Sequence, residues 1–437
     1  MKTVIFCPRG TATGGTELLH QLGYKLGLFG FEVYMYYYGD EDDRPVVHPH
    51  FTMYAVPRTE ILSDSPNTCY IYPEVATSSI KEIKSQFPAS KHIMWWLSVD
   101  NAGMTEELER YISEDAEIIH FVQSYYALDY VKNRLHVPEE RLYYLSDYIN
   151  TVFLNISNNE QRDDIVLFNP RKGYERTSSL IRNSSYQIKW QALSGIIPGD
   201  IPGVLQKAKV YIDFGNHPGK DRFPREAVAC GCRVITGRRG AAAFDQDVPI
   251  DDQLRIADDT DDGVILNIIK WLLENYDRSA GLYEEYDRMI KEEFHSFETD
   301  TLKLFSMLSG SAIEGMDLSE EELRAKVLEL VSSENYTKAF YFLTVYRMKG
   351  FGFDNDMLIL EGYTRMGLKE EQVALYLMNK LLENSPDNYE AYLIKGRALC
   401  CISPEKAQDA FDNAVRYSKG TDDEGYILET VKSQQYF

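Results

Sequence analysis

The sequence predicts an α/β protein with two successive domains of alternating strands and helices, followed by an all-helical region. Three observations support this fold class. Short apolar runs alternate with amphipathic stretches up to about residue 148. The same alternation restarts near residue 149 and continues to about residue 295. From about residue 317 onward the apolar spacing is that of helices, and it repeats.

In the first region, residues 1–148, five short β-rich runs are separated by helical segments. A helix is expected over Thr16–Phe29, ended by Gly30, and another over Ser124–Leu135. The expected strands are Thr3–Cys7, Phe31–Tyr38, Cys69–Tyr72, His92–Leu97 and Ile118–Val122. A strand–helix–strand rhythm of this kind favours a parallel sheet with helices on both faces.

The second region, residues 149–310, repeats this pattern. Strands are expected at Asp164–Phe168, Tyr186–Leu193, Lys209–Phe214 and Arg233–Thr236. Helices are expected at Glu175–Arg182, Ile201–Lys207, Arg225–Cys230 and, as one long stretch, Asp262–Leu308. Two such units in succession predict two facing Rossmann-like domains, with a ligand between them off the C-terminal ends of the strands.

The third region, residues 317–437, contains an internal repeat of 34 residues. Three sets of positions share this spacing: Ala339, Val373 and Ala407; Leu343, Leu377 and Phe411; Gly362 and Gly396. A 34-residue period is typical of tetratricopeptide repeats and predicts about three helix pairs. An irregular helical bundle is the alternative. Such repeats present a concave face, so we expect this region to dock a protein partner or to mediate self-association.

Composition excludes several classes of partner. The 437 residues are 44% hydrophobic and 26% charged, which indicates a globular protein and not a disordered one. Lys and Arg number 46 against 68 Asp and Glu, a net charge of −22. We therefore expect no nucleic-acid partner and at most a peripheral contact with a membrane.

The cysteines and the first residues indicate a cytoplasmic protein. The six cysteines have neither disulfide-framework spacing nor partner histidines for a zinc site, so reduced thiols and no metal site are expected. The opening stretch Met1–Pro8 is too short for a signal peptide, and no apolar run approaches about 18 residues.

Two clusters carry candidate chemistry. The first is Gly14–Glu17, between the first strand and its helix, where Gly14 and Gly15 would let the backbone approach an anion at the helix N-terminus. A tight turn without a ligand is the alternative for this cluster.

The second cluster joins Phe168–Gly173 with Gly215–Gly237, each following a strand of the second domain. Its cations suit a diphosphate, and they are Arg171, Lys172, Lys220 and Arg222. Glu226 opens the next helix, where its carboxylate would accept hydrogen bonds from a ribose. The alternative is that the cations are surface residues and that Glu226 complements the helix dipole.

These segments resemble the GT-B glycosyltransferases of the glycogen-synthase-like group. The resemblance rests on Gly14–Gly15, Gly30–Val33, Ser124–Val131, Tyr144–Asn150 and Pro224–Ile235, and covers roughly residues 1–308. It implies that Arg171 and Lys172 contact the diphosphate of a nucleotide-sugar donor and that Glu226 contacts the nucleotide ribose. The family's usual glutamate eight positions before Glu226 is Pro218 here, so retention or inversion of configuration is left open.

For the reaction, Arg171 and Lys172 would stabilise the departing nucleoside diphosphate, with help from Lys220. No Asp-x-Asp motif occurs where expected, which predicts metal-independent chemistry with the nucleotide sugar as co-substrate and no other cofactor. In an inverting enzyme, Asp100 is the favoured base, although a turn-capping role is the alternative; His217 and His20 are weaker candidates. Trp95 and Trp96 would either stack on a sugar or lie in the core.

The predicted function is transfer of a sugar to a glycan or protein-linked acceptor, in bacterial surface polysaccharide or glycoconjugate synthesis. Two alternatives stay open. A nucleotide-sugar 2-epimerase shares the architecture and a phosphate-binding rim, but would leave the helical repeats without a purpose. A non-catalytic scaffold would use the repeats alone, and the cationic cluster argues against it.

Overall fold

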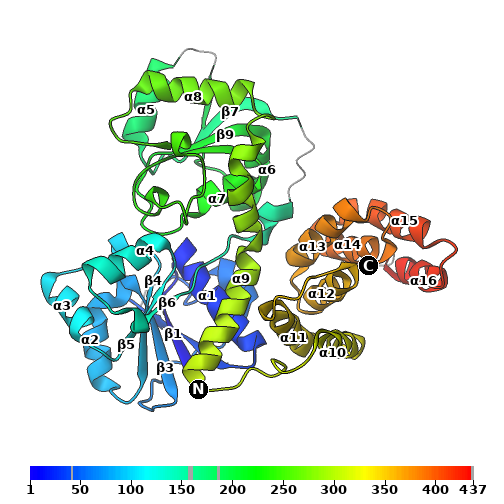
Figure 1. Ribbon diagram of the computed structural model, residues 1–437, viewed down its shortest axis with the longest axis horizontal. Helices are drawn as coiled ribbons and strands as arrows, with labels where there is room; N and C mark the ends of the chain where they lie inside the picture. The colour runs from blue at the N-terminus through cyan, green and yellow to red at the C-terminus, as the bar shows by residue number, and fades with distance from the viewer. Residues whose placement is uncertain (41–42, 156–160, 185–187, 435–437) are drawn as a thin grey trace. The chain divides into compact units, whose positions relative to one another are not determined.

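The computed structural model describes residues 1–40, 43–155, 161–184 and 188–434, and the chain forms two compact units (Figure 1). The first unit comprises residues 1–149 and 156–309 and contains both sheets. The second comprises residues 150–155 and 310–437 and is helical. None of the helices in the described ranges combines the length and apolar character needed to cross a bilayer.

The first sheet has six parallel strands in the order β2-β1-β3-β4-β5-β6. These are β1 (Lys2–Pro8), β2 (Glu32–Tyr38), β3 (Thr68–Pro73), β4 (Lys91–Trp96), β5 (Ile118–Val122) and β6 (Leu142–Tyr144). Its α-helices are α1 (Gly14–Leu28), α2 (Thr77–Gln86), α3 (Glu106–Glu114) and α4 (Tyr125–Asp129). The helix expected over Ser124–Leu135 continues beyond α4 as a wider, π-helical turn over Tyr130–Arg134.

The second sheet has five parallel strands in the order β11-β10-β9-β7-β8. These are β7 (Asp163–Phe168), β8 (Lys189–Ala192), β9 (Ala208–Asp213), β10 (Arg233–Gly237) and β11 (Arg255–Ile256). Its helices are α5 (Tyr174–Asn183), α6 (Ile201–Lys207), α7 (Arg222–Ala229), α8 (Asp262–Glu274) and α9 (Glu284–Ser309). The strand expected over Tyr186–Leu193 starts at residues that lie outside the described ones.

Both sheets share one strand order. If the strands are numbered from the start of each domain, their order across the sheet is second, first, third, fourth and fifth, and the first sheet adds a sixth strand after the fifth. The direction of strand progression therefore reverses between β1 and β3 in one sheet and between β7 and β9 in the other. In open parallel sheets, ligands bind beyond the carboxyl ends of the strands at this reversal. The fold thus points to the loops that follow β1 and β3 in the first sheet and β7 and β9 in the second.

The first sheet is buried on both faces. Trp95 packs with Ile5 on one face and Trp96 with Val4 on the other, because successive side chains of a strand point to opposite faces. Trp95 donates its indole N–H to the Leu145 carbonyl at 3.1 Å. Both tryptophans are core residues, so of the two roles considered for them the core role holds and sugar stacking does not.

Helix α9 contributes to both halves of the first unit. It packs against α7 and α1 (Figure 1), and its Phe297 and Phe305 join the core that contains Ile5. The buried pair Lys25–Glu298, at 2.8 Å, adds a contact between α1 and α9.

The helical stretch expected over Asp262–Leu308 is present, but it is divided, because the chain breaks between α8 and α9. The connecting segment is bonded to the second sheet: the Tyr283 hydroxyl donates to the Val234 carbonyl at 2.9 Å, and the Arg233 side chain donates to the Tyr276 carbonyl. These tertiary contacts outweigh the local helical pattern.

The second unit consists of successive packed helices. They are α10 (Glu320–Ser332), α11 (Tyr336–Met348), α12 (Asn355–Gly367), α13 (Glu371–Asn384), α14 (Tyr389–Ile402), α15 (Ala407–Ser418) and α16 (Glu424–Gln434). Two glycines that share the 34-residue spacing each lie close to a side chain of the next helix. A Cβ on Gly362 would press on Met378 of α13, and one on Gly396 would press on Phe411 of α15. The all-helical region is confirmed, and its tetratricopeptide character stays a prediction.

Candidate functional site

Loops from both sheets meet at the strand-order reversal of the first unit. The Val99 N–H, after β4, donates to the Pro218 carbonyl, after β9, at 2.9 Å. The Lys220 N–H donates to the Gln123 side chain at 2.9 Å. A Cβ on Gly219 would clash with the carbonyl oxygen of Leu97, so only glycine permits this approach. We call this region, made of residues 13–17, 97–101, 169–173, 213–219, 221–222 and 226, the loop junction.

The Gly14–Gly15 turn begins α1 at the loop junction. Thr13 caps the helix. Its hydroxyl accepts a hydrogen bond from the Thr16 N–H at 3.2 Å, and the Thr16 hydroxyl accepts one from the Thr13 N–H at 2.9 Å. A Cβ on Gly14 would lie 3.0 Å from Nε of Arg222. The glycine therefore leaves space for an arginine from the second domain.

Arg222 crosses from α7 to the first domain. It forms an ion pair with Glu17 and donates to the Gly14 carbonyl at 3.1 Å. Tyr54 donates its hydroxyl to the same Glu17 carboxylate at 3.0 Å. Burial lowers the pKa of Arg222, but Glu17 and Asp147 raise it by more, so the guanidinium stays charged. Its Nε is buried without a hydrogen-bond partner among the described residues.

Arg171 and Lys172 lie in the turn between β7 and α5. Gly173, at φ +58°, packs against the backbone of Phe214, and a Cβ on Gly215 would lie 2.6 Å from Cβ of Lys172. The Lys172 side chain is 30% exposed and pairs with Asp221. Arg171 is exposed, and within the described residues its side chain has no partner. The structure thus brings Arg171, Lys172 and Arg222 to the loop junction, as expected.

Lys220 does not join these cations. Its ammonium is buried and donates to Glu293 at 2.8 Å and to the Ser146 hydroxyl at 3.1 Å. Arg225, fully buried, pairs with the same Glu293 and with Asp147, both at 2.8 Å. Burial lowers the pKa of Lys220, but Glu293, Tyr144 and Asp147 together raise it by more. We call Lys220, Arg225, Asp147 and Glu293 the buried ion network. It links α7, α9 and the end of the first domain.

Glu226 lies on α7, one turn after Arg222. Its side chain is buried, and within the part of the chain that the structure describes it makes no hydrogen bond. Burial raises its pKa to about 7, opposed by Arg222 and Arg225. Glu226 is the fifth residue of its helix, so it does not cap the N-terminus. A carboxyl group in this state is available to a ligand hydroxyl.

Asp100 follows β4 and bridges the two domains. Its carboxylate accepts the Tyr126 hydroxyl at 2.8 Å and the Asn216 amide at 2.6 Å. It is exposed, so an acceptor hydroxyl can reach it. Its role as a base stays a prediction. His20 has both ring nitrogens engaged, donating to the Thr16 carbonyl and accepting from Tyr37.

Sequence reasoning missed Glu74, which directly follows β3. It is buried and accepts the Leu97 N–H at 3.1 Å, and burial raises its pKa to about 7. Glu74 thereby holds the start of the loop that carries Asp100. Its position immediately after a buried strand at the strand-order reversal was the available signal.

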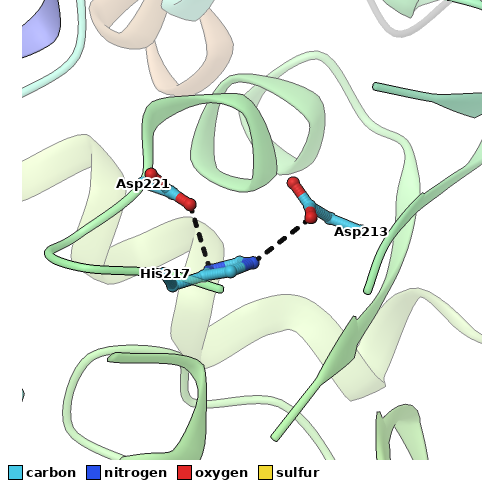
Figure 2. Close-up of side chains that lie close together, drawn as sticks. All are labelled: Asp213, His217 and Asp221. Atoms are coloured by element: carbon cyan, nitrogen blue, oxygen red, sulfur yellow. Dashed lines mark ion pairs between the residues drawn. The ribbon is translucent and has the colours of Figure 1, made fainter. Parts of the chain in front are cut away.

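His217 lies between two carboxylates (Figure 2). Its Nε2 is 3.5 Å from Asp213, and its Nδ1 is 3.6 Å from Asp221. Burial raises the pKa of Asp213, but His217, the Gly215 N–H and Lys172 lower it by more. Asp213, His217 and Asp221 could together hold a metal ion, because the nitrogen and oxygen atoms that they offer lie within 4.8 Å of one another. Among the described residues, no other group of three His, Cys, Asp or Glu side chains does this. Lys172 pairs with Asp221, and Nε2 of His217 is buried without a hydrogen-bond partner in the part of the chain that the structure describes.

Comparison with known proteins identifies the fold. No family model matches the chain, and no curated protein matches it. A solved glycosyltransferase from Rickettsia africae ESF-5 is 12% identical, with 70% of this chain and 98% of that chain covered and a TM-score of 0.54. A sucrose-phosphate synthase from Thermosynechococcus elongatus is 15% identical, with 71% of this chain and 100% of that chain covered and a TM-score of 0.53.

The first unit has the GT-B fold. The predicted fold class, two Rossmann-like domains followed by an all-helical domain, is confirmed. At these identities the likeness is one of fold, so the chemistry has to be argued from the loop junction itself.

Proposed function

We propose that this protein transfers a sugar from a nucleoside-diphosphate sugar to an acceptor. The loop junction carries the proposal: at the strand-order reversal of a GT-B fold it gathers three cations, a glycine turn at a helix N-terminus and an unbonded buried carboxyl. Arg171, Lys172 and Arg222 come from two loops of the second domain, and Gly14 and Gly15 from the first. In a chain of net charge −22, such a gathering of cations matches an anionic ligand.

The leaving group explains why cations belong here. Departure of a nucleoside diphosphate builds negative charge on a phosphate oxygen, and cations fixed nearby stabilise that charge. Among the described residues, the Arg171 side chain has no partner and Nε of Arg222 makes no hydrogen bond, so both can bind a phosphate without losing a contact. Lys172 would have to leave Asp221 or bind both groups. The N-terminus of α1 adds unpaired N–H groups. These groups supply the positive charge, and we propose that the reaction is independent of metal ions.

Glu226 would bind the nucleotide ribose, because its carboxyl lies one helical turn from Arg222 and makes no hydrogen bond within the described part of the chain. Lys220, bound in the buried ion network, would act indirectly by holding the second-domain loop in place. Asp100 would take the proton of the acceptor hydroxyl if the reaction inverts configuration, with Tyr126 and Asn216 fixing the direction of its carboxylate.

The proposed acceptor is a glycan or a protein-linked glycan, in bacterial surface polysaccharide or glycoconjugate synthesis. We propose that the helical unit docks this acceptor, a protein partner or a second copy of the chain. Leu328 and Tyr426 are exposed apolar residues of this unit. If it docks a partner, Leu328→Glu with Tyr426→Glu should change the oligomeric state or turnover on the acceptor and leave nucleotide binding as it is.

The decisive experiment incubates the protein with a panel of nucleotide sugars, with and without glycan acceptors, and follows release of nucleoside diphosphate. Acceptor-dependent release supports the transferase. Conversion of one nucleotide sugar to its epimer without acceptor supports the epimerase, and no turnover or binding at all contradicts both.

Lys172→Met should abolish most turnover in the same assay. Lys270→Met, on α8, is the matched control, since its side chain is 62% exposed and pairs with Glu274 of the same helix. Asp100→Asn should lower kcat by about 10²–10⁴-fold if Asp100 is the base. Unchanged turnover after addition of a chelator is the result expected for metal-independent chemistry.

A further inference from the structure

Asp247 is a buried carboxylate of the second domain that the proposed reaction leaves without a role. It is 1% exposed, and its two oxygens accept the Tyr125 N–H at 2.9 Å and the Tyr126 N–H at 3.0 Å, at the start of α4 in the first domain. Burial raises the pKa of Asp247, and these two N–H groups oppose that shift. The first N–H groups of a helix lack partners within the helix and carry partial positive charge, so a carboxylate is favourable there. Asp247 therefore holds the first turn of α4 from the other domain.

The segment that carries Asp247 contacts α4 at two further points. The ring of Phe244 packs against the ring of Tyr126, with centroids 5.8 Å apart. The short turn Ala241–Ala243 also packs against α4, and its first N–H donates to the His217 carbonyl at 2.8 Å. The Asp247 N–H donates to the Phe244 carbonyl at 3.1 Å. Asp247 thus lies on a hydrogen-bonded turn of the second domain that is packed against α4 as a whole.

Tyr126 connects this contact to the candidate base. Its hydroxyl donates to Oδ1 of Asp100 at 2.8 Å, and the Asn216 amide donates to Oδ2 of Asp100 at 2.6 Å. The main chain of Tyr126 is held by Asp247 and its ring contacts Phe244, so the second domain sets the position of the tyrosine hydroxyl. Asn216 also belongs to the second domain. The two groups that donate to Asp100 are therefore both fixed from the second domain, although Asp100 itself belongs to the first.

We propose that Asp247 is a positioning residue for Asp100: it holds Tyr126 so that the tyrosine hydroxyl fixes the direction of the Asp100 carboxylate. Because Asp247 and Asp100 belong to different domains, the contact between the domains completes the geometry of the base. The catalytic part of this inference rests on the proposed function, in which Asp100 takes the proton of the acceptor hydroxyl. The hydrogen-bonded connection from Asp247 through Tyr126 to Asp100 does not depend on that function.

The first test is carbon NMR of the full chain with tyrosine labelled with ¹³C at Cζ, using Tyr126→Phe to assign the Tyr126 signal. Asp100→Ala gives the shift that follows when the hydroxyl loses its hydrogen bond to Asp100. Asp247→Ala should move the Tyr126 signal in the same direction. Asp247→Asn, which keeps the size of the side chain and one acceptor oxygen, should give a smaller shift in that direction and serves if the alanine variant does not fold. A Tyr126 signal at its wild-type position in both Asp247 variants overturns the proposal.

Asp64→Ala is the matched control. Asp64 also accepts two successive backbone N–H groups, those of Ala89 and Ser90, at 2.9 and 3.0 Å. These residues lie just before β4, whereas the loop junction follows β4. Asp64→Ala should therefore leave the Tyr126 signal and kcat as in wild type. Effects equal to those of Asp247→Ala would show that loss of any such pair of bonds is sufficient, and they overturn the proposal.

The second test is steady-state kinetics with UDP-glucose, GDP-mannose and ADP-glucose as donors and p-nitrophenyl glycosides as acceptors. For the pair that reacts, Asp247→Ala should lower kcat about tenfold or more and change KM for the donor by less than about twofold, because it misplaces the base and leaves the donor site intact. In the Asp100→Asn background the same substitution should lower kcat no further, since the two residues act as one unit.

Two kinetic results overturn the proposal: a wild-type kcat in Asp247→Ala, or an equal loss of kcat from Asp247→Ala in the wild-type and Asp100→Asn backgrounds. Failure of the proposed function gives a different result. If wild type releases no nucleoside diphosphate from any of these donors, the proposed function fails for them, and the NMR comparison still decides whether Asp247 holds Tyr126 against Asp100.

Discussion

Lys172 and Lys220 follow neighbouring strands of one sheet, and their surroundings differ completely. Lys172 is 30% exposed and pairs with Asp221 at the edge of the loop junction. Lys220 is 4% exposed and pairs with Glu293 in the buried ion network. The comparison shows that position after a strand does not make a cation available to a ligand. The burial of the lysine and its ion-pair partner decide whether it can bind a ligand. Of these two lysines, Lys172 is the one that can exchange its carboxylate partner for a ligand at low cost.

The buried ion network and the loop junction also differ in what their charges can do. In the network, Lys220 and Arg225 face Asp147 and Glu293, so the charges balance within a dry interior. Removing one partner leaves an uncompensated buried charge. At the loop junction, Arg171 is solvated, and Lys172 is in partial contact with solvent, so loss of one charge costs less stability.

The largest expected effect is that of breaking the buried ion network. Arg225→Met leaves Asp147 and Glu293 without their shared partner, so the free energy of unfolding should fall by about 3–5 kcal/mol. Urea denaturation measures this. Arg171→Met is the control and should change stability by less than about 0.5 kcal/mol. Equal effects of the two substitutions would remove the distinction between the two regions.

The next largest effect is the dependence of folding stability on pH that Glu226 causes. Its pKa is raised from 4.5 to about 7 in the folded protein, so the folded state keeps a proton that the unfolded state has released. The contribution to stability is present below pH 4.5 and is lost as pH rises through 7, on the order of 3 kcal/mol in total. Glu226→Gln cannot lose this proton, so it should gain stability over wild type as pH rises from 4 to 8.

Urea denaturation at a series of pH values tests this, and calorimetry on the same variant tests the ribose role. Glu74→Gln is the matched comparison, because Glu74 has a similarly raised pKa but accepts the Leu97 N–H. Both variants should flatten the pH dependence, and only Glu226→Gln should weaken nucleotide binding. Parallel pH profiles for Glu226→Gln and wild type would contradict the argument.

A third prediction separates the two lysines directly. Lys172→Met should weaken nucleoside-diphosphate binding by about 1.5–3 kcal/mol, the contribution of a charge-assisted hydrogen bond. Its stability should change by no more than about 1 kcal/mol. Lys220→Met should show the opposite pattern, with the larger loss in stability. Calorimetry and thermal denaturation of both variants decide, and a reversed pattern would show that Lys220 is the ligand-binding lysine.

The smallest effect is expected for Arg171. Because its side chain is exposed and unpaired in the described residues, Arg171→Gln should weaken nucleoside-diphosphate affinity by about 0.2–1 kcal/mol, and the loss should shrink at high salt. Calorimetry at two ionic strengths measures it. A loss as large as that of Lys172→Met, independent of salt, would show that ligand binding draws Arg171 into a dry contact.

Several site residues were predictable because their signals are local. The Gly14–Gly15 turn, the Arg171–Lys172 pair and the helix with Glu226 each follow a strand that periodicity alone indicates. What each side chain contacts was not predictable. Arg222 pairs with Glu17, 205 positions away in the chain. The residue pattern of a single segment cannot predict a contact between residues so far apart. Lys220 was grouped with the other cations because Glu293 lies on a helix far along the chain.

By itself the sequence determined most strands of both α/β domains, their order along the chain and the loops that carry charge, but not the short strands β6 and β11 or the helices α2 and α3. Periodicity and turn residues are properties of short segments, so they can be recognised without knowledge of the tertiary structure. The tertiary structure alone decided the break between α8 and α9, the withdrawal of Lys220 into the interior and the placing of His217 between two aspartates. Each of these depends on which segments pack together, because burial and charge pairing are energies between residues distant in the chain.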